Sequence, residues 1–367
     1  MNSWKETELS DVLDYVQPTQ YIVSNTNYNN NYETPVLTPG KSFILGYTSE
    51  TTGVYTDVPV IIFDDFTTAF KYVDFPFKVK SSAMKILKAN SGEYDIKFIY
   101  YLMKTLNFEA KEHKRYWISK YSKQNVLIPP LNQQKKIAAI LDAADAYRQK
   151  TKALIDKYDQ LSQSLFLEMF GDIRQFPRKA LKECTSFIDY RGKSPNKSES
   201  GIPLLTAKNV KPGYISPEPR EFIPEDDYVS WMVRGFPKTG DVLFTTEAPL
   251  GQAAILPKYD KVAIAQRLIC LQPDESLNPT FLLHTILSLY FQHELNKRST
   301  GSTAKGIRSK ELAKIEIPIP PIKTQSDFAR HIYSIDEQKK YVDDNYKKSE
   351  NLFNSLLQKA FKGELTT

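Results

Sequence analysis

The chain has few cysteines and no apolar run long enough to cross a membrane. Its 367 residues include only Cys184 and Cys270, which are too few for a disulfide framework and form no metal-ligand spacing with the four histidines. The longest apolar run extends from Phe281 to Phe291 and is interrupted by His284, so it is too short to span a bilayer. The chain opens with the polar, acidic segment MNSWKETELSDV, which is unlike a signal peptide. We therefore expect a cytoplasmic protein with buried thiols and no membrane contact.

Recognisable catalytic and nucleotide-binding motifs are also missing. The sequence contains neither G-x-G-x-x-G nor G-x-x-x-x-G-K-[ST], which argues against the common phosphate-cradling loops. The Asn-Pro-Pro-aromatic motif expected of an adenine methyltransferase is absent as well. Asp64 and Asp65 are adjacent carboxylates, but Glu50 and Asp57 add no metal-ligand spacing. A strand-end turn or a contact to a base edge is therefore favoured over a metal site, and we expect no cofactor and no catalytic residue.

The strongest positive feature is an internal repeat. Residues 128–170 align with residues 319–361 without a gap when the chain is shifted by 191 positions, and eleven of the 43 aligned pairs are identical. The identities include a Pro-Pro pair and a glutamine, Gln134 in the first copy and Gln325 in the second. Such a repeat divides the chain into two units, each a globular part followed by the repeated segment. The sequence therefore predicts a tandem duplication.

Each copy is predicted to form one long helix. A Pro-Pro pair disfavours helix at the residues before it, so the helix begins just beyond the pair, and Gly171 supplies a C-terminal stop in the first copy. Apolar residues recur at alternating steps of three and four, which is typical of a coiled-coil seam. In the first copy this seam contains Ile137, Ile140, Ala144, Tyr147, Thr151, Leu154, Tyr158, Leu161 and Leu165. About 34 helical residues at about 1.5 Å each give a rod of roughly 50 Å.

The second copy has a less regular seam. It keeps Phe328, Ile332, Ile335, Val342, Leu352, Leu356 and Phe361. It places Asn345 and Ser349 where the pattern predicts apolar residues.

The apolar stripe of each helix has to be buried, and its nearest mate in the chain is the other copy. Duplicated halves are often related by a pseudo-twofold axis, which makes the two helices antiparallel. The fold class we expect is α+β, with two globular α/β domains separated by two long antiparallel helices that form a coiled-coil spacer. The alternative is that the helices are unrelated and pack on their own domains.

The predicted domain organisation follows the repeat. We expect globular domains at residues 1–127 and 173–314, and helical segments at residues 128–172 and 315–367. Short β-branched and aromatic runs separated by Gly, Pro and Asp predict a small sheet in each globular part, followed by a helix at residues 94–111 and 278–297. The net charge is +6, and the excess lies in residues 173–314, with 21 Lys/Arg against 15 Asp/Glu. This favours nucleic acid over membrane as a partner, since neither long helix has a basic polar face.

Candidate DNA contacts lie in basic loops and at strand ends. Lys305 and Arg308 lie among small residues that let the backbone approach a phosphate, and Lys114 occupies the place of Lys305 in the first repeat. Paired donors and acceptors that suit base edges occur at predicted strand ends, with Glu247 and Arg267 among them. The predicted DNA-binding residues are Lys41, Thr67, Thr68, Lys80, Lys114, Arg115 and Tyr116 in the first globular part, and Arg191, Lys193, Lys208, Asn209, Gln252, Gln266, Lys305 and Arg308 in the second. The alternative for each basic loop is a surface loop with incidental charge.

The order of these features resembles the DNA-specificity subunits of type I restriction-modification systems. The resemblance is carried by two Pro-Pro-Leu/Ile turns, each followed by a glutamine and a long helix, that alternate with unlike globular parts. The segment GSTAKGIRSKELAKIEIPIPP at residues 301–321 resembles that family's approach to its conserved helix. The segments FILGYTSETTGVY and IIFDDFTTAFKYVDFPFKVKSSAMKIL resemble one of its target-recognition domains.

The resemblance implies a subunit without catalytic activity, whose two target-recognition domains each bind one half of a split asymmetric sequence in double-stranded DNA. It also implies that the helices fix the gap between the halves and dock two methyltransferase subunits, which use S-adenosylmethionine. Through these subunits the complex recruits ATP-dependent restriction subunits. Two alternatives stay open at this point: an enzyme with an unrecognised nuclease or methyltransferase site, and a scaffold whose globular parts bind proteins.

Overall fold

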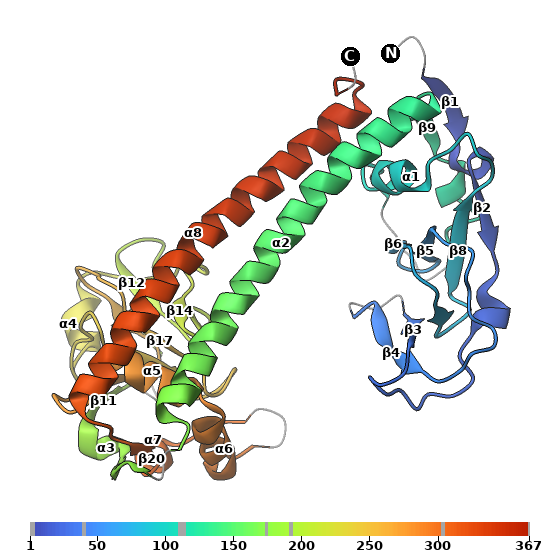
Figure 1. Ribbon diagram of the computed structural model, residues 1–367. Coiled ribbons are helices and arrows are strands. Elements are labelled where there is room, and N and C mark those ends of the chain that lie inside the picture. Colours follow the sequence, from blue (N-terminus) through green and yellow to red (C-terminus); the bar gives the residue numbers. More distant parts are fainter. Residues whose placement is uncertain are drawn as a thin grey trace. The chain divides into compact units, whose positions relative to one another are not determined.

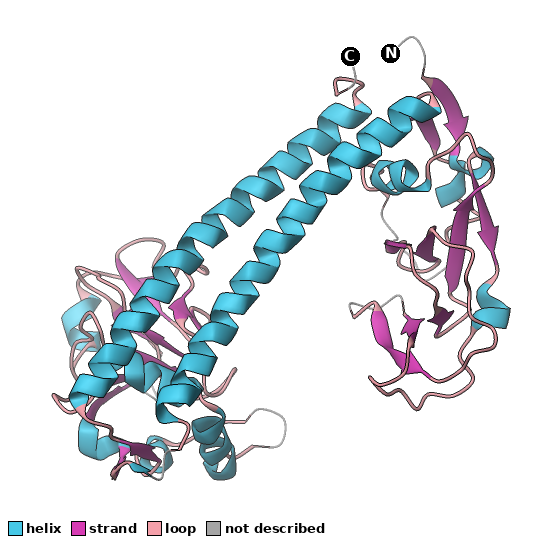
Figure 2. Cartoon of the chain, viewed as in Figure 1, coloured by secondary structure: helices cyan, strands magenta, loops and turns pink. Residues whose placement is uncertain are grey.

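The structure divides into two compact units that share both long helices. The computed structural model describes residues 4–38, 42–108, 115–172, 175–190, 194–301 and 305–365. Unit 1 consists of residues 1–152 and 344–367, and unit 2 of residues 153–343. Figure 1 labels the elements, and Figure 2 shows that the strands belong to the globular parts that the two long helices connect. We call the globular part of unit 1 head 1 (residues 4–128) and that of unit 2 head 2 (residues 175–318).

The repeated segments form the helices α2 (Leu131–Phe170) and α8 (Ile322–Phe361), of 40 residues each. At about 1.5 Å per residue, each corresponds to roughly 60 Å of helix. Gly171 closes α2 by donating its N–H to the Leu167 carbonyl oxygen at 2.7 Å, and a Cβ at this position would lie 2.4 Å from that oxygen. The prediction of two long helices is confirmed. Each starts at the residue after the second proline, as predicted, and has 40 residues instead of the expected number of about 34.

The two helices pack antiparallel within each unit. In unit 1 a shared core joins residues from the start of α2 with residues from the end of α8. In unit 2 Asp159 forms an ion pair with Lys339, and the ring of Phe166 lies 5.7 Å from that of Phe328. Residues with higher numbers on α2 therefore contact residues with lower numbers on α8. The antiparallel arrangement predicted from the repeat is therefore confirmed.

The face that α2 buries differs from the predicted seam. Ile140, Tyr147, Leu154 and Leu161 were expected in the seam, but they are 36%, 55%, 41% and 50% exposed. The predicted seam residues Ile137 and Thr151 are buried, and so are Gln134, Ala138, Leu141 and Asp145, which lie outside the predicted seam. The prediction was wrong at the four exposed positions because α2 carries two neighbouring stripes, and periodicity does not show which one meets the partner.

The seam on α8 departs from the prediction in a similar way. Leu352 is 52% exposed, whereas the next residue, Phe353, is buried. Ser349 faces inward although it is polar. Its hydroxyl donates to the Tyr346 carbonyl oxygen at 2.7 Å, so a polar seam residue is satisfied within its own helix.

The described residues of head 1 form two small sheets, a strand pair and one α-helix. The four-stranded antiparallel sheet has the order β2 (Leu13–Val16), β8 (Met84–Ala89), β5 (Val60–Asp64) and β6 (Phe70–Val73). The three-stranded sheet has the order β4 (Ile44–Thr48), β3 (Thr34–Leu37) and β7 (Lys78–Val79). The remaining elements are the pair β1 (Lys5–Glu8) and β9 (Asn125–Ile128), the helix α1 (Ile96–Met103), and the 3₁₀ helices Leu9–Asp11, Pro18–Tyr21 and Tyr121–Lys123.

Head 2 has the same kinds of elements and some additions. Its four-stranded antiparallel sheet has the order β11 (Thr185–Asp189), β19 (Leu268–Pro273), β16 (Val242–Thr245) and β17 (Ala253–Ile255). Its three-stranded sheet has the order β15 (Phe222–Ile223), β12 (Ile202–Leu205) and β18 (Ala263–Ile264). Two strand pairs complete it, β10 (Arg178–Ala180) with β20 (Glu316–Pro318) and β13 (Val210–Lys211) with β14 (Tyr214–Ile215). The helices are α3 (Leu181–Cys184), α4 (Asp227–Trp231), α5 (Pro279–Leu287), α6 (Leu289–Arg298) and α7 (Ser309–Leu312).

The single helix expected at residues 278–297 is two helices. Ser288 separates α5 from α6, with an extended backbone at ψ 151°. Its Oγ accepts a hydrogen bond from the N–H of Phe291 at 3.3 Å and so caps α6. A serine in an apolar run therefore starts a new helix here rather than continuing the first.

The two heads share one topology. The strand that precedes α1 in head 1 (β8) and the strand that precedes α5 in head 2 (β19) both lie inside their four-stranded sheets, and each three-stranded sheet contains one parallel pair, β3–β7 or β12–β18. Strand pairs at the head–helix connection also correspond, β1–β9 in one head and β10–β20 in the other. Because the head sequences match poorly, the common plan supports the tandem duplication independently of the repeated helices.

Both cysteines are buried, as the sequence predicted. Cys184 and Cys270 are buried and are not joined in a disulfide, and burial raises the pKa of the Cys184 thiol to about 11. Burial likewise raises the pKa of the Cys270 thiol. Among the described residues, no helix combines the length and the apolar character needed to cross a lipid bilayer.

Candidate nucleic-acid interface

A buried glutamine fixes head 1 to the start of its long helix. The side chain of Gln134 on α2 is 1% exposed. Its Oε1 accepts from the N–H of Asp95, the residue that caps α1, at 2.8 Å. Its Nε2 donates to the carbonyl oxygens of Pro129 at 2.8 Å and Glu93 at 3.1 Å. The glutamine thus joins the Pro-Pro turn to the first helix of the head.

Gln325 makes the same connection in unit 2. Its Oε1 accepts from the N–H of Asn278, the residue that caps α5, at 2.8 Å. Its Nε2 donates to the carbonyl oxygens of Pro320 at 2.8 Å and Ser276 at 3.0 Å. The sequence identified both glutamines only as identities in the repeat. The structure adds that each positions its head through main-chain groups alone.

A second equivalent feature brings the predicted basic loops to the sheets. In head 1, Asp65 follows β5, donates its N–H to the Ala83 carbonyl oxygen at 2.9 Å and accepts from the N–H of Tyr116 at 2.9 Å. In head 2, Thr246 follows β16 and makes the same two bonds, to the Arg267 carbonyl oxygen and from the N–H of Ile307, both at 3.0 Å. We call the end of the sheet at which these three residues meet, together with the residues next to them, the junction of its head. Tyr116 and Ile307 are 191 residues apart, so the repeat extends into this loop.

The junction of head 1 contains a buried ion pair. The carboxylate of Asp65 lies 3.8 Å from the ammonium of Lys85, and the two side chains are 2% and 1% exposed. Burial lowers the pKa of Lys85, an effect that the Asp65 carboxylate opposes. Asp65 Oδ1 also accepts from the N–H groups of Tyr116 at 3.1 Å and Trp117 at 2.8 Å. The pair therefore holds the segment that leads into α2 against the end of the sheet.

The side chain of Asp64 makes hydrogen bonds within the turn that follows β5. Its carboxylate accepts from the N–H of Phe66 at 3.0 Å and from the hydroxyl of Thr67 at 2.6 Å. Across the described part of the chain, no group of three or more His, Cys, Asp or Glu side chains is arranged to hold a metal. The strand-end turn considered from the sequence is the role that these contacts support.

The junction of head 2 carries exposed charges instead of a buried pair. Arg267 Nε lies 2.8 Å from Glu247 Oε1, with the side chains 54% and 45% exposed. Glu247 forms a β-bridge with Gly306, so the basic loop that contains Lys305 is attached next to this pair. Glu247 after β16, Arg267 before β19 and Gly306 in the segment that leads to α8 therefore meet at one end of the sheet.

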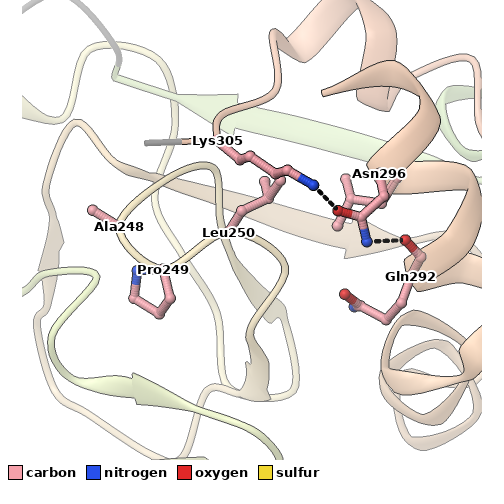
Figure 3. Close-up of a pocket in the computed structure, with 7 residues that line it drawn as sticks. Ala248, Pro249, Leu250, Gln292, Asn296 and Lys305 are labelled. Carbon is pink, nitrogen blue, oxygen red and sulfur yellow. Dashed lines mark hydrogen bonds between the residues drawn. The ribbon is translucent and has the colours of Figure 1, made fainter. Parts of the chain in front are cut away.

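A shallow cavity lies beside this junction. It has a volume of about 410 Å³, and it is lined by Ala248, Pro249, Leu250, Gln292, Leu295, Asn296 and Lys305. Figure 3 shows Lys305 reaching across it toward Asn296, whose Oδ1 accepts from Lys305 Nζ at 3.3 Å. Lys305 is exposed. Its ammonium is thus displayed at the same end of head 2 as Arg267.

The other predicted DNA-binding residues differ in exposure. Thr67, Arg115, Lys208 and Arg308 are exposed, and Thr68, Lys80, Gln252 and Gln266 are partly buried. Thr68 adopts φ 59° in the turn after β5, and Gln266 Nε2 donates to the hydroxyl of Ser194 at 3.1 Å. Lys41, Lys114, Arg191 and Lys193 lie outside the described residues.

Two predicted contacts have structural roles in their heads. Tyr116 is 2% exposed, and its ring lies 5.3 Å from that of Phe108. Asn209 is also 2% exposed. Its side chain accepts from the N–H and hydroxyl of Thr206, both at 3.0 Å, and donates to the carbonyl oxygens of Ser216 and Pro219 at 3.1 and 3.0 Å. Neither side chain is displayed to a ligand, so we leave both out of the interface proposed below.

Comparisons with known proteins agree on one family. A family model described as the type I restriction modification DNA specificity domain matches residues 1–157 and 235–341. The specificity subunit of the type I restriction enzyme EcoR124I/EcoR124II of Escherichia coli is 33% identical over 342 residues, which cover 86% of this chain and 83% of that protein. The MjaVIII specificity subunit of Methanocaldococcus jannaschii is 25% identical over 286 residues, covering 70% and 67%.

Two solved structures have the same fold. The S subunit of the type I restriction-modification system from M. genitalium matches with a TM-score of 0.63 at 15% identity, over 98% of this chain and 96% of that chain. A chain from a structural study of complex assembly and conformational transition in the type I system matches with a TM-score of 0.53 at 17% identity, over 100% and 99%. At these identities the likeness concerns the fold.

Proposed function

Because the chain belongs to the DNA specificity subunits of type I restriction-modification systems, we propose that each of its heads binds one half of a bipartite, asymmetric target in double-stranded DNA. As such a subunit it is the DNA-recognition component of the complex and is not itself catalytic. In this proposal the target-recognition domains are residues 1–127 and 173–314. The segments 128–172 and 315–367 set the gap between the two half-sites.

One observation carries the proposal: the heads have the same topology but different residues at equivalent places. Asp65 is followed by Phe66 in head 1, and the equivalent Thr246 is followed by Glu247 in head 2. The residue before β8 is Ala83 in head 1, and the residue before the equivalent strand β19 is Arg267 in head 2. Base contacts depend on the side chains that a scaffold presents. Two copies of one scaffold with unlike side chains at a strand end are suited to binding two different sequences.

The exposed stripe on α2 supports docking of methyltransferase subunits. Ile140, Tyr147, Leu154 and Leu161 repeat every seven residues and are all at least 36% exposed. A heptad-spaced apolar stripe is the pattern that binds a further helix in a coiled coil. We propose that two methyltransferase subunits, which bind S-adenosylmethionine, dock on the long helices and recruit restriction subunits. We place the assembled complex in the cytoplasm, where it has access to DNA.

The proposal is tested by mapping methylated adenines in a host that carries this chain with its methyltransferase subunits. We expect one asymmetric sequence made of two specified parts separated by a fixed number of unspecified base pairs. Deleting the gene for this chain is the control and removes the methylation. A continuous target, or two parts with a variable gap, would contradict the assignment of two heads and a spacer.

A further inference from the structure

The Glu247–Arg267 pair at the junction of head 2 has no evident part in holding the fold. Both side chains are about half exposed, and ion pairs with this exposure contribute little to stability because water screens them. The backbone of the junction is joined by main-chain hydrogen bonds that need neither side chain. The pair therefore calls for another role.

The geometry leaves one edge of the Arg267 guanidinium for a ligand. Glu247 Oε1 lies against Nε, on the side of the group. Apart from Glu247, no described residue forms a hydrogen bond or an ion pair with this side chain. The ion pair at Nε restrains the guanidinium, and the terminal nitrogens Nη1 and Nη2 have no partner among the described residues. Two parallel donors of this kind match the O6 and N7 acceptors of guanine in the major groove.

Glu247 is itself held in place by the loop that carries the exposed lysine. It forms a β-bridge with Gly306, and a Cβ at Gly306 would lie 3.6 Å from Glu247 Oε2. Lys305, the preceding residue, is exposed beside the pair. A cation suited to a phosphate thus lies near a guanidinium suited to a base, which is how protein–DNA contacts divide between positioning and specificity.

We propose that Arg267 recognises a guanine in the half-site of head 2, that Glu247 is its positioning residue, and that Lys305 contacts the DNA backbone. This rests on the proposed function, in which residues 173–314 bind DNA. Head 1 has Ala83 and Phe66 at the two equivalent positions, so the same contact is missing from its junction. The guanine requirement therefore belongs to one half-site only.

The test uses the full chain assembled with its methyltransferase subunits, and it measures methylation and binding of DNA duplexes changed one base pair at a time. For Arg267→Ala we expect discrimination at one G·C pair of the head 2 half-site to fall by about 10- to 100-fold. Arg267→Lys, which keeps the charge but not the fork, relaxes the same position. Glu247→Ala relaxes that position more weakly, and Glu247→Gln, which keeps a partner for Nε, restores much of the discrimination.

Lys305→Ala separates this inference from the proposed function. We expect it to weaken binding to all duplexes alike and to reduce the salt dependence of log K by about 0.9. The control is Lys258→Ala, which removes an exposed charge. Lys258 follows β17 and lies beyond the start of β16, at the opposite end of the strand from the junction. This variant should change neither the affinity for DNA nor its salt dependence. If Lys305→Ala has its effect and Arg267→Ala leaves every base preference intact, the inference is overturned and head 2 still binds DNA. If head 2 does not bind DNA, neither variant alters the half-site and both ideas fail.

Discussion

At the scale of single residues, His284 gives unit 2 a dependence on pH. It lies on α5 with its ring 5.1 Å from that of Phe328 and 6.2 Å from that of Phe166, and burial lowers its pKa to about 4 from an ordinary value of 6.5. Below pH 6.5 the unfolded chain binds a proton that the folded chain does not, so stability is lost as pH falls toward 4. At pH 5 the loss from this residue amounts to about 2 kcal/mol.

We expect His284→Phe to remove that part of the pH dependence. The free energy of unfolding, measured by urea denaturation at pH 7.5 and pH 5, should fall less in this variant than in the natural chain. His331 is exposed on α8, so His331→Gln is the matched control and should keep the full pH dependence. An unchanged difference between the two pH values in His284→Phe would show that other groups account for it.

Residue roles were only partly predictable from the sequence. The correspondence of Lys114 with Lys305 followed from the 191-residue shift, and the neighbouring junction bonds of Tyr116 and Ile307 agree with it. The internal partners of Asn209 could not be foreseen, because they come from a turn whose shape depends on the surrounding sheet. The pairing of Asp65 with Lys85 likewise depends on the register of β5 against β8, which composition does not determine.

At the scale of elements, the attachment of α8 to head 2 depends on Gln325. This side chain is fully buried, and its three hydrogen bonds satisfy the N–H of Asn278 and two carbonyl oxygens. Gln325→Leu keeps the approximate volume but leaves these groups unpaired, which we expect to cost about 2–4 kcal/mol in the free energy of unfolding. Urea denaturation of the purified chain measures this loss. Gln338→Leu, at an exposed position of the same helix, should change stability by less than about 0.5 kcal/mol, and equal stabilities of the two variants would refute the role given to Gln325.

The long helices were the most predictable elements, and their buried faces the least. Their beginnings follow from the Pro-Pro pairs, which act locally on the backbone. Their orientation about the helix axis follows from packing between side chains that are distant in sequence. Because α2 carries two neighbouring stripes, periodicity alone could not predict which stripe meets α8 and which one is exposed.

At the scale of the whole molecule, the duplication includes the two heads as well as the two long helices, although only the helices match in sequence. The repeated helices keep recognisable identities because both must form the same antiparallel pair. The heads keep only their topology, since many side-chain combinations fill a small sheet. Gln134 and Gln325 explain how this divergence is tolerated: each contacts its head through main-chain N–H and carbonyl groups, which are present whatever side chains the head carries.

This mode of attachment predicts that heads can be exchanged as units. Replacing residues 173–314 with the corresponding segment of another member of the family should preserve the connection to α8. Within the head, Gln325 needs only the main-chain N–H of Asn278 and the carbonyl oxygen of Ser276 at the start of α5. We expect methylated-adenine mapping to show a new sequence in one half-site, with the other half-site and the gap unchanged. Replacing the segment with its own sequence carrying Lys258→Ala controls for the manipulation. A change in both half-sites, or in the gap, would mean that the heads and helices do not act as separate modules.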